Sequence, residues 1–153
     1  MHENAKKIVI LLADDDPDDR DMTRKALEKN HLANELYMVG DGEELMDYLR
    51  HQGRFAPPAL SPTPGLILLD LNMPKKDGRE ALAEIKRDAA LRRIPVVVVT
   101  TSKAEEDIFR TYDLGCNSFI SKPITLPGLV DVMMLIGKYW FQIVTLPDAT
   151  DGS

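Results

Sequence analysis

Short apolar runs alternate along this chain with longer amphipathic stretches. The runs at 8–13, 66–69 and 94–99 show no alternation of apolar and polar residues, which indicates strands buried on both faces. Two further runs, at 35–39 and 117–120, also have strand character. The pattern therefore predicts five short strands.

Stretches with helical periodicity fill the intervals between these strands and follow the last one. The predicted helices cover 17–30, 42–51, 78–90, 104–114 and 125–140. Regular alternation of strand and helix is typical of a parallel sheet with helices on both faces. We therefore expect an α/β protein, a doubly wound (βα)5 unit around a central five-stranded parallel sheet.

Acidic residues surround the start of the first predicted helix. Asp16 stands before a proline at the first helical position, so we expect it to cap the helix. Asp18 and Asp19 fall in the first turn, where they oppose the helix dipole. Helix capping and compensation of the helix dipole are sufficient to explain why these three residues are acidic. They do not explain Asp14 and Asp15, which precede the cap at the end of a buried strand.

The segment 51–64 interrupts the rhythm of strands and helices. Its sequence, HQGRFAPPALSPTP, carries four prolines and no periodic apolar pattern. We expect a long surface loop between the second helix and the third strand. The alternative is a polyproline motif that binds a partner.

Composition narrows the functional classes. A chain of 153 residues can form one domain with a substantial core, but not a comfortable second one. The formal net charge of −6 disfavours binding to nucleic acid or to anionic membranes. The first residues lack the apolar core of a signal peptide, and no apolar run approaches the roughly 18 residues that span a bilayer. We expect a cytoplasmic protein whose single cysteine, Cys116, is a core residue rather than a redox centre.

Charged residues follow three of the predicted strands. Asp14 and Asp15 come after the first strand, and Asp70 comes after the third. Lys122 comes after the fifth. Because the carboxyl ends of parallel strands meet at one edge of the sheet, we expect these side chains to gather there. Three carboxylates offer the oxygen ligands that Mg²⁺ prefers, and the cation would relieve their mutual repulsion.

The same residues suggest phosphoryl transfer. With a metal ion beside it, the Asp70 carboxylate is a candidate nucleophile that attacks phosphorus and forms an acyl phosphate. Lys122 and Thr100 follow different strands to the same edge and are placed to stabilise the phosphoryl oxygens. Each has a plain structural alternative, as a solvated loop lysine and as the last residue of a β-branched strand.

Four stretches of the chain resemble the response regulator receiver domains of two-component signalling. They are ILLADDDPDD at 10–19, LILLDLNMPKKDG at 66–78, IPVVVVTTS at 94–102 and FISKP at 119–123. The resemblance covers about residues 7–140 and implies a flavodoxin-like fold. Because the residues after Lys122 suffice for one helix and a tail only, we expect a stand-alone receiver.

The resemblance also implies a role for individual residues in the metal site. Asp70 would be the phosphoacceptor and Asp15 the direct magnesium ligand. Asp14 would act mostly through water, and the backbone carbonyl of Asn72 would complete the metal site.

Three further residues match the phosphate-binding and switch positions of the family. Thr100 would be the switch hydroxyl, and Phe119 the switch aromatic, although Phe119 could also be only a core residue. Lys122 would bind the phosphoryl group, aimed by a cis peptide bond before Pro123.

In function, the resemblance implies a phosphoacceptor response regulator that receives a phosphoryl group on Asp70 from a histidine kinase and then switches its surface. Such a protein is not otherwise an enzyme, since it catalyses only its own magnesium-dependent phosphotransfer and dephosphorylation. The loop at 51–64, the LDLNMPKKDGREALAEIK stretch at 69–86 and the TLP at 145–147 resemble receivers that partner bacterial and cyanobacterial phytochromes. A bacteriophytochrome is therefore the expected kinase.

Two other functional classes share parts of the pattern. A phosphatase of the haloacid-dehalogenase type also uses an aspartate nucleophile with magnesium, but it needs a second acid two residues later, where this chain has Asn72. A flavin-binding flavodoxin-like module shares the fold. However, no Gly-rich or Ser/Thr-rich loop follows the first strand to hold a flavin phosphate.

The last predicted helix is apolar on nearly all sides. From 126 to 141 its only charged residues are Asp131 and Lys138. A helix of this kind is expected to be buried on more than its core side, which predicts a homodimer. The expected interface residues are Leu129, Met133, Ile136, Trp140 and Phe141.

The chain after this helix is expected to form an arm of the dimer. Residues 142–147 would cross to the partner, or would instead fold back over their own domain. The expected organisation is one receiver domain over 1–153, with a core at about 7–140, a C-terminal tail at 141–153 and no output domain.

Overall fold

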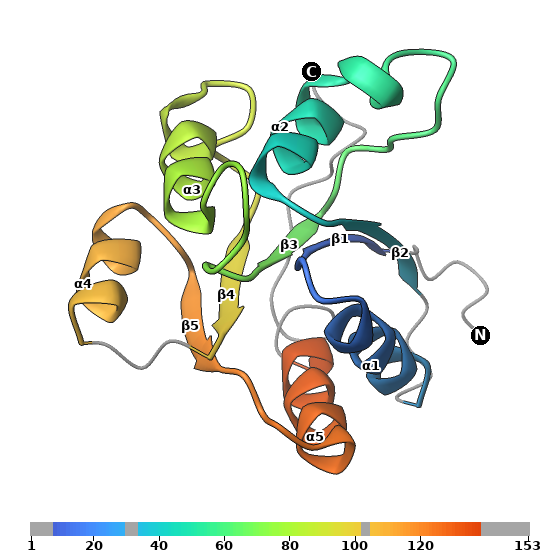
Figure 1. The fold of residues 1–153 in the computed structure, drawn as a ribbon, viewed down its shortest axis with the longest axis vertical. Helices are drawn as coiled ribbons and strands as arrows, with labels where there is room; N and C mark the ends of the chain where they lie inside the picture. Colours follow the sequence, from blue (N-terminus) through green and yellow to red (C-terminus); the bar gives the residue numbers. More distant parts are fainter. Residues whose placement is uncertain (1–7, 30–33, 102–104, 139–153) are drawn as a thin grey trace.

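The computed structural model describes residues 8–29, 34–101 and 105–138, and Figure 1 shows how they are arranged. Five strands form one parallel sheet in the order β2-β1-β3-β4-β5. The strands are β1 (Ile8–Ala13), β2 (Asn34–Val39), β3 (Leu66–Leu69), β4 (Val96–Thr100) and β5 (Ser118–Ser121). The predicted α/β class with a five-stranded parallel sheet is confirmed.

The described helices follow the strands in strict alternation. They are α1 (Pro17–Lys29), α2 (Gly42–Arg50), α3 (Gly78–Arg87), α4 (Glu105–Asp113) and α5 (Leu126–Gly137). Their boundaries agree with the predicted ones to within a few residues, and the predicted end of the last helix lies outside the described residues. In the part of the chain that the structure describes, no helix has the length and apolarity needed to cross a membrane.

Asp16 caps α1 as its sequence position predicts. Its Oδ1 accepts hydrogen bonds from the backbone N–H groups of Asp18, at 2.8 Å, and of Asp19, at 3.4 Å. These are two of the N–H groups that the first turn of a helix leaves without a partner. The cap therefore sets the point at which the chain leaves β1 and turns into α1.

The sheet separates two hydrophobic cores. Helices α1 and α5 pack together on one face, and α2 and α3 lie on the other (Figure 1). Strand β1 contributes to both cores, because Ile10 and Leu12 point to the first and Leu11 and Ala13 to the second. Since both faces are covered, successive residues of the central strands are all apolar, which explains the pattern seen in the sequence.

The proline-rich segment 51–64 is a loop held against α2, as predicted for a surface loop. It contains a short 3₁₀ helix, η1 (Gly53–Phe55). The hydroxyl of Tyr48 donates to the Pro62 carbonyl at 2.7 Å, and the rings of Tyr48 and Phe55 meet edge to face with centroids 5.2 Å apart. Ser61 is buried, and its hydroxyl donates to the Phe55 carbonyl at 3.2 Å.

Helix α5 differs from the sequence-based expectation. Leu129, Met133 and Ile136 were predicted to face a second copy of the chain, but all three are buried in the core beneath α1 and α5. That assignment is wrong for these side chains, because they already pack against their own domain. The outward side of α5 instead carries Met134 and Leu135, which are 41% and 64% exposed.

The two other predicted interface residues, Trp140 and Phe141, lie outside the described residues.

Strand register decides which residues share the carboxyl edge of the sheet. Strands β1 and β3 pair up to their last residues, so Asp14 and Asp70 leave neighbouring strands side by side. Strands β4 and β5 pair as far as Thr100 and its partner in β5. The backbone N–H of Lys122 then donates to the Thr100 carbonyl at 2.8 Å and extends this pairing by one step. The sheet ladder itself therefore brings these four residues to one edge.

Gly78, the first residue of α3, lies against the backbone that follows β3. Its N–H donates to the Leu71 carbonyl at 2.9 Å. A Cβ atom at Gly78 would lie 2.4 Å from the Asp70 carbonyl oxygen and 2.7 Å from the Leu71 Cα. Both are backbone atoms, so no side-chain rotation relieves the overlap. Glycine is required for α3 to begin this close to Asp70.

Replacing Gly78 with alanine is expected to lower the free energy of unfolding by about 2 kcal/mol or more, because the new methyl group forces the backbone beside Asp70 to move. Urea denaturation followed by circular dichroism measures this change.

Gly65→Ala is the matched control. A Cβ atom there would meet its nearest neighbour, the Ile8 Cγ2, at an ordinary 3.5 Å. Its unfolding free energy is expected to stay within about 1 kcal/mol of wild type. Equal losses in the two variants would contradict the account of Gly78.

Candidate functional site

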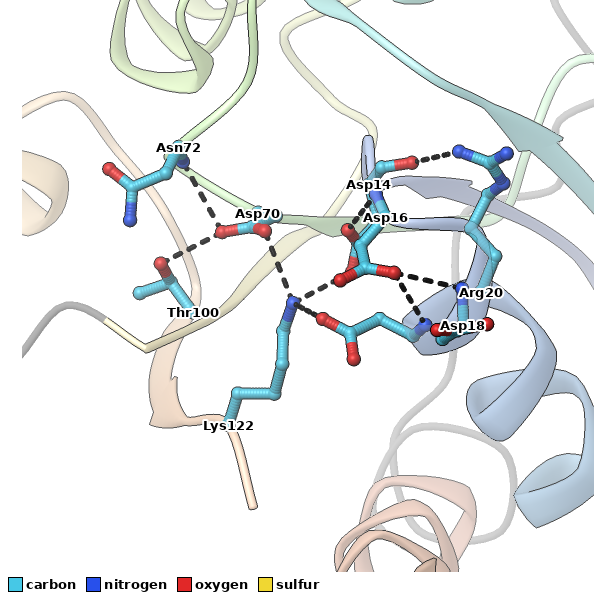
Figure 2. A network of polar contacts seen from close by, with 9 residues as sticks. Asp14, Asp16, Asp18, Arg20, Asp70, Asn72, Thr100 and Lys122 are labelled. Atoms are coloured by element: carbon cyan, nitrogen blue, oxygen red, sulfur yellow. Dashed lines mark hydrogen bonds and ion pairs between the residues drawn. The ribbon is translucent and has the colours of Figure 1, made fainter. Parts of the chain in front are cut away.

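Three carboxylates meet at the carboxyl edge of the sheet, and Figure 2 shows two of them, Asp14 and Asp70. Asp14 follows β1 and Asp70 follows β3, and both side chains are buried. Asp15 stands beside them and is exposed. Each of the three offers a carboxylate oxygen, and these oxygens lie within 4.8 Å of one another. The structure thus brings together the three aspartates that the sequence suggested as metal ligands.

The two oxygens of Asp70 have different partners. Oδ1 accepts a hydrogen bond from the Thr100 hydroxyl at 2.9 Å and one from the Asn72 backbone N–H at 3.3 Å. Oδ2 contacts the Lys122 Nζ at 3.1 Å. Figure 2 shows these contacts reaching Asp70 from both sides of its carboxylate. The carboxylate is therefore held in a defined orientation by groups from β4, from the loop after β3 and from the residue after β5.

Lys122 stands among three carboxylates. Its Nζ lies 2.7 Å from the Asp14 Oδ2, 3.0 Å from the Asp19 Oδ2 and 3.1 Å from the Asp70 Oδ2. An ammonium group has three N–H donors, so each donor can face one carboxylate. Only 9% of the Lys122 side chain is exposed. The lysine is therefore an internal counter-ion of the acidic cluster.

Asp14 is held on both its side chain and its backbone. Its Oδ1 accepts from the Asp16 N–H at 3.0 Å, and its carbonyl accepts from the Arg20 guanidinium at 2.6 Å. Burial raises the pKa of the Asp14 carboxyl above its ordinary value and outweighs the hydrogen bond from Lys122. Burial alone would lower the pKa of Lys122, but its carboxylate partners, Asp14 first, raise it further, so the lysine stays charged.

The donor set fits a hard divalent cation. Asp14, Asp15 and Asp70 present oxygen atoms only, and carboxylate oxygens are the ligands that Mg²⁺ takes in proteins. The three carboxylates carry more negative charge than the single ammonium of Lys122 compensates. The N–H of Asn72 donates to the Asp70 carboxylate, so the residue whose carbonyl is the expected further ligand lies beside the cluster.

The predicted switch residues lie on neighbouring strands. Thr100 ends β4 and is fully buried. Phe119 lies in β5, is half-buried and packs against the core beneath α2 and α3. Its backbone N–H donates to the hydroxyl of Tyr112 at 3.1 Å, which links β5 to α4.

The expectation of a cis peptide bond before Pro123 is wrong. Among the described residues, the cis peptide bond joins Pro57 to Pro58. Lys122 reaches the carboxylates without a cis bond, because its backbone continues the pairing of β5 with β4 and so brings its side chain to the sheet edge.

The sequence interpretation missed two contributors to the site. The sequence explains Asp19 only as an acid at the start of a helix, whereas its carboxylate also contacts Lys122. Arg20 received no role, yet its guanidinium holds the Asp14 carbonyl. Their position in the sequence could have indicated this role. The first turn of α1 follows the end of β1 directly, so its side chains lie at the same edge of the sheet.

Comparison with known proteins places these features in a family context. A family model described as response regulator receiver domain matches residues 10–134. The response regulator Rcp1 of Synechocystis sp. is 42% identical over 146 residues, which cover 95% of this chain and 97% of that protein.

Solved structures agree with this match. The phosphorylated cyanobacterial phytochrome response regulator RcpA superposes with a TM-score of 0.86 at 45% identity, over 94% of this chain and 100% of that one. The Mn²⁺-bound form of Rcp1 gives a TM-score of 0.85 at 43% identity, over 92% of this chain and 99% of that one. The flavodoxin-like fold expected from the motifs is confirmed by these superpositions.

Replacing Lys122 with glutamine is expected to lower the free energy of unfolding by roughly 2–4 kcal/mol in the absence of divalent cations, because two buried carboxylates lose their counter-ion. Adding MgCl₂ is expected to raise the free energy of unfolding more in this variant than in wild type, since the cation supplies the missing positive charge. Urea denaturation with EDTA and with MgCl₂ measures both effects.

Lys75→Gln is the control for this variant. Lys75 is exposed, and its Nζ lies 3.8 Å from the nearest carboxylate oxygen, on Asp41. Its unfolding free energy is expected to change by less than about 1 kcal/mol. If Lys122→Gln were no less stable than Lys75→Gln, the charge of Lys122 would not contribute to the free energy of unfolding.

Proposed function

The chain belongs to the response regulator receiver family, and we propose that Asp70 is the residue on which it accepts a phosphoryl group from a histidine kinase. The observation that carries this proposal is the setting of Asp70. Its carboxylate lies at a sheet edge between a hydroxyl, an ammonium and two further carboxylates. Neither the phosphatase nor the flavin-binding alternative is favoured by the family match.

The transfer itself needs a nucleophile and groups that receive negative charge. An oxygen of the Asp70 carboxylate attacks phosphorus, the bond from phosphorus to the kinase histidine breaks, and its electron pair returns to the histidine nitrogen. The product is an acyl phosphate, with about one more negative charge than the free carboxylate. Lys122 and Thr100 already donate to the two oxygens of Asp70 and are the residues proposed to follow the new phosphoryl oxygens.

Asp14, Asp15 and Asp70 are the residues proposed to hold Mg²⁺, with the backbone carbonyl of Asn72 as a further ligand. In this assignment Asp15 binds directly and Asp14 acts mostly through water. A cation held there would supply positive charge to the phosphoryl oxygens and help to orient the group for in-line attack. The protein's own contribution is to keep the carboxylates together at the edge of the sheet, with Lys122 as the positive group opposite them.

We propose that Thr100 and Phe119 carry the change from Asp70 to the surface. Movement of the Thr100 hydroxyl toward the phosphoryl group would leave room for Phe119 to move inward. Phe119 is linked to α4 through its N–H and the Tyr112 hydroxyl. The surface formed by α4, β5 and α5 is therefore the proposed output of the switch.

The proposed phosphodonor is a phytochrome with histidine kinase activity. Two observations support this choice: the solved structure of RcpA is described as a cyanobacterial phytochrome response regulator, and its sequence is 45% identical to this chain. The exchange is proposed to take place in the cytoplasm. Phosphoryl transfer from such a kinase in its phosphorylated form tests the pairing directly.

Wild type incubated with acetyl phosphate and MgCl₂ is expected to gain the mass of one phosphoryl group, as measured by intact-protein mass spectrometry. Asp70→Asn is expected to gain none, because the amide is isosteric with the acid but lacks the nucleophilic oxygen. Replacing MgCl₂ with EDTA is expected to suppress incorporation in wild type as well.

Asp113→Asn, at the exposed end of α4, controls for the loss of one carboxylate elsewhere and is expected to incorporate as wild type does. Incorporation into Asp70→Asn would place the phosphoacceptor at another residue.

We also propose that the chain forms a homodimer through the outward side of α5. Met134 and Leu135 expose apolar surface there, next to the inward residues that already pack in the core. Trp140 and Phe141, which lie outside the described residues, remain proposed as further anchors. Apolar residues gathered on one exposed side of a helix are typical of interfaces between copies of a chain.

The double substitution Met134→Glu and Leu135→Glu is expected to convert the dimer to a monomer, because it places two charges in the proposed apolar interface. Multi-angle light scattering gives the molar mass, and circular dichroism verifies that the fold is kept.

Leu60→Glu is the control, since Leu60 is also an exposed apolar residue but belongs to the loop at 51–64. It is expected to remain a dimer. A double variant with the molar mass of wild type would remove α5 from the interface.

A further inference from the structure

Lys122 and the proposed cation share two ligands. The lysine contacts Asp14, Asp19 and Asp70, whereas the cation set is Asp14, Asp15 and Asp70. A divalent cation on this set therefore meets the ammonium of Lys122 on the same two carboxylates. The two positive charges would repel each other, which would weaken the contacts of Lys122 with both carboxylates.

Lys122 has little freedom to move out to solvent. Its side chain is 9% exposed, and its backbone N–H is bound to the Thr100 carbonyl at 2.8 Å. A charged group that stays this buried needs a counter-charge within reach. Among the three carboxylates around Lys122, Asp19 is the one outside the cation set.

The position of Asp19 is fixed through the backbone of the site itself. The N–H of Asp19 binds the Asp16 side chain, and the N–H of Asp16 binds the Asp14 side chain. Two successive hydrogen bonds thus tie the first turn of α1 to the carboxylate that the cation would share with Lys122. The carboxylate of Asp19 is 32% exposed, so it can carry its charge at lower cost than the buried Asp14.

We propose that Asp19 is a positioning residue that holds Lys122 when a divalent cation occupies Asp14, Asp15 and Asp70. The inference rests on the proposed function, because it requires that cation site. Asp19 keeps the lysine compensated while the cation displaces it, and it keeps the ammonium close to Asp70 for the phosphoryl group that follows. Asp19 acts through Lys122 and does not touch the reacting atoms.

Asp19 also lies in the first turn of α1, where any carboxylate opposes the helix dipole. Asp18 shares that position and its charge, and its side chain is exposed. Comparing substitutions at Asp18 and Asp19 therefore distinguishes a contact with Lys122 from a general effect of charge at the helix start.

The test is the affinity for Mn²⁺, measured by isothermal titration calorimetry on the unphosphorylated full chain. Asp19→Asn is expected to weaken binding roughly fivefold, equivalent to about 1 kcal/mol, because the displaced lysine loses its counter-charge. Asp18→Asn is expected to change the affinity less than about twofold, since it removes the same charge without a contact to Lys122. Asp19→Glu keeps the charge and is expected to retain most of the affinity.

A second comparison uses the Lys122→Gln background. There, Asp19→Asn is expected to change the Mn²⁺ affinity no more than Asp18→Asn does, because no lysine remains to be held. The same fivefold loss in this background would mean that Asp19 attracts the cation directly, and the proposal would fail. Wild-type affinity in the single variant Asp19→Asn would also overturn it, and that comparison stands even where Lys122→Gln is too unstable to titrate.

The wild-type titration separates this inference from the function on which it rests. Absence of Mn²⁺ binding to wild type would refute the cation site itself, and the role of Asp19 with it. Binding to wild type with no difference between Asp19→Asn and Asp18→Asn would refute the role of Asp19 alone.

Discussion

Repulsion between the carboxylates at one sheet edge is the constraint on which the rest of the site depends. Asp14 and Asp70 follow neighbouring strands that pair to their last residues, so the hydrogen-bonded ladder keeps them close despite the repulsion between their carboxylates. Burial makes this repulsion harder to screen. Lys122 offsets part of it from inside the cluster. The negative charge that Lys122 leaves uncompensated would favour a bound cation, and the backbone pairing keeps that charge in place.

The same ladder explains why so much of the fold and the site follows from the sequence. Both faces of the sheet are covered, so the central strands are continuous apolar runs that end abruptly in charge, and β3 was located to the residue by its run and by the Asp70 that follows it. The predicted start of β4 is less accurate, because an apolar residue indicates burial but does not indicate pairing with a neighbouring strand. Ile94 and Pro95 are apolar and buried, yet β4 begins only at Val96. A proline has no N–H to give to a ladder.

Local sequence patterns do not predict contacts between side chains that are far apart in the chain. Asp19 and Lys122 are 103 residues apart, and no local pattern marks their contact, because the orientation of α1 over the sheet edge is decided by its packing against α5. Helix α5 illustrates the same limit. Its nearly all-round apolar surface shows that more than one side can be buried, but it does not show which side faces the domain's own core. The packing of Leu129, Met133 and Ile136 beneath α1 and α5 settles that question.

The sheet also separates the fixed parts of the site from the part that is free to respond. Asp14 and Asp70 follow β1 and β3, each of which is paired on both sides. Phe119 lies in β5 and Lys122 follows its end, and within the described residues β5 is an edge strand that pairs with β4 alone. In the proposed function, a new charge on Asp70 would act first on Lys122, which lies three residues along the chain from Phe119. Because an edge strand has one ladder of hydrogen bonds to restrain it and a central strand has two, such a change would pass toward α4 more easily than toward the centre of the sheet.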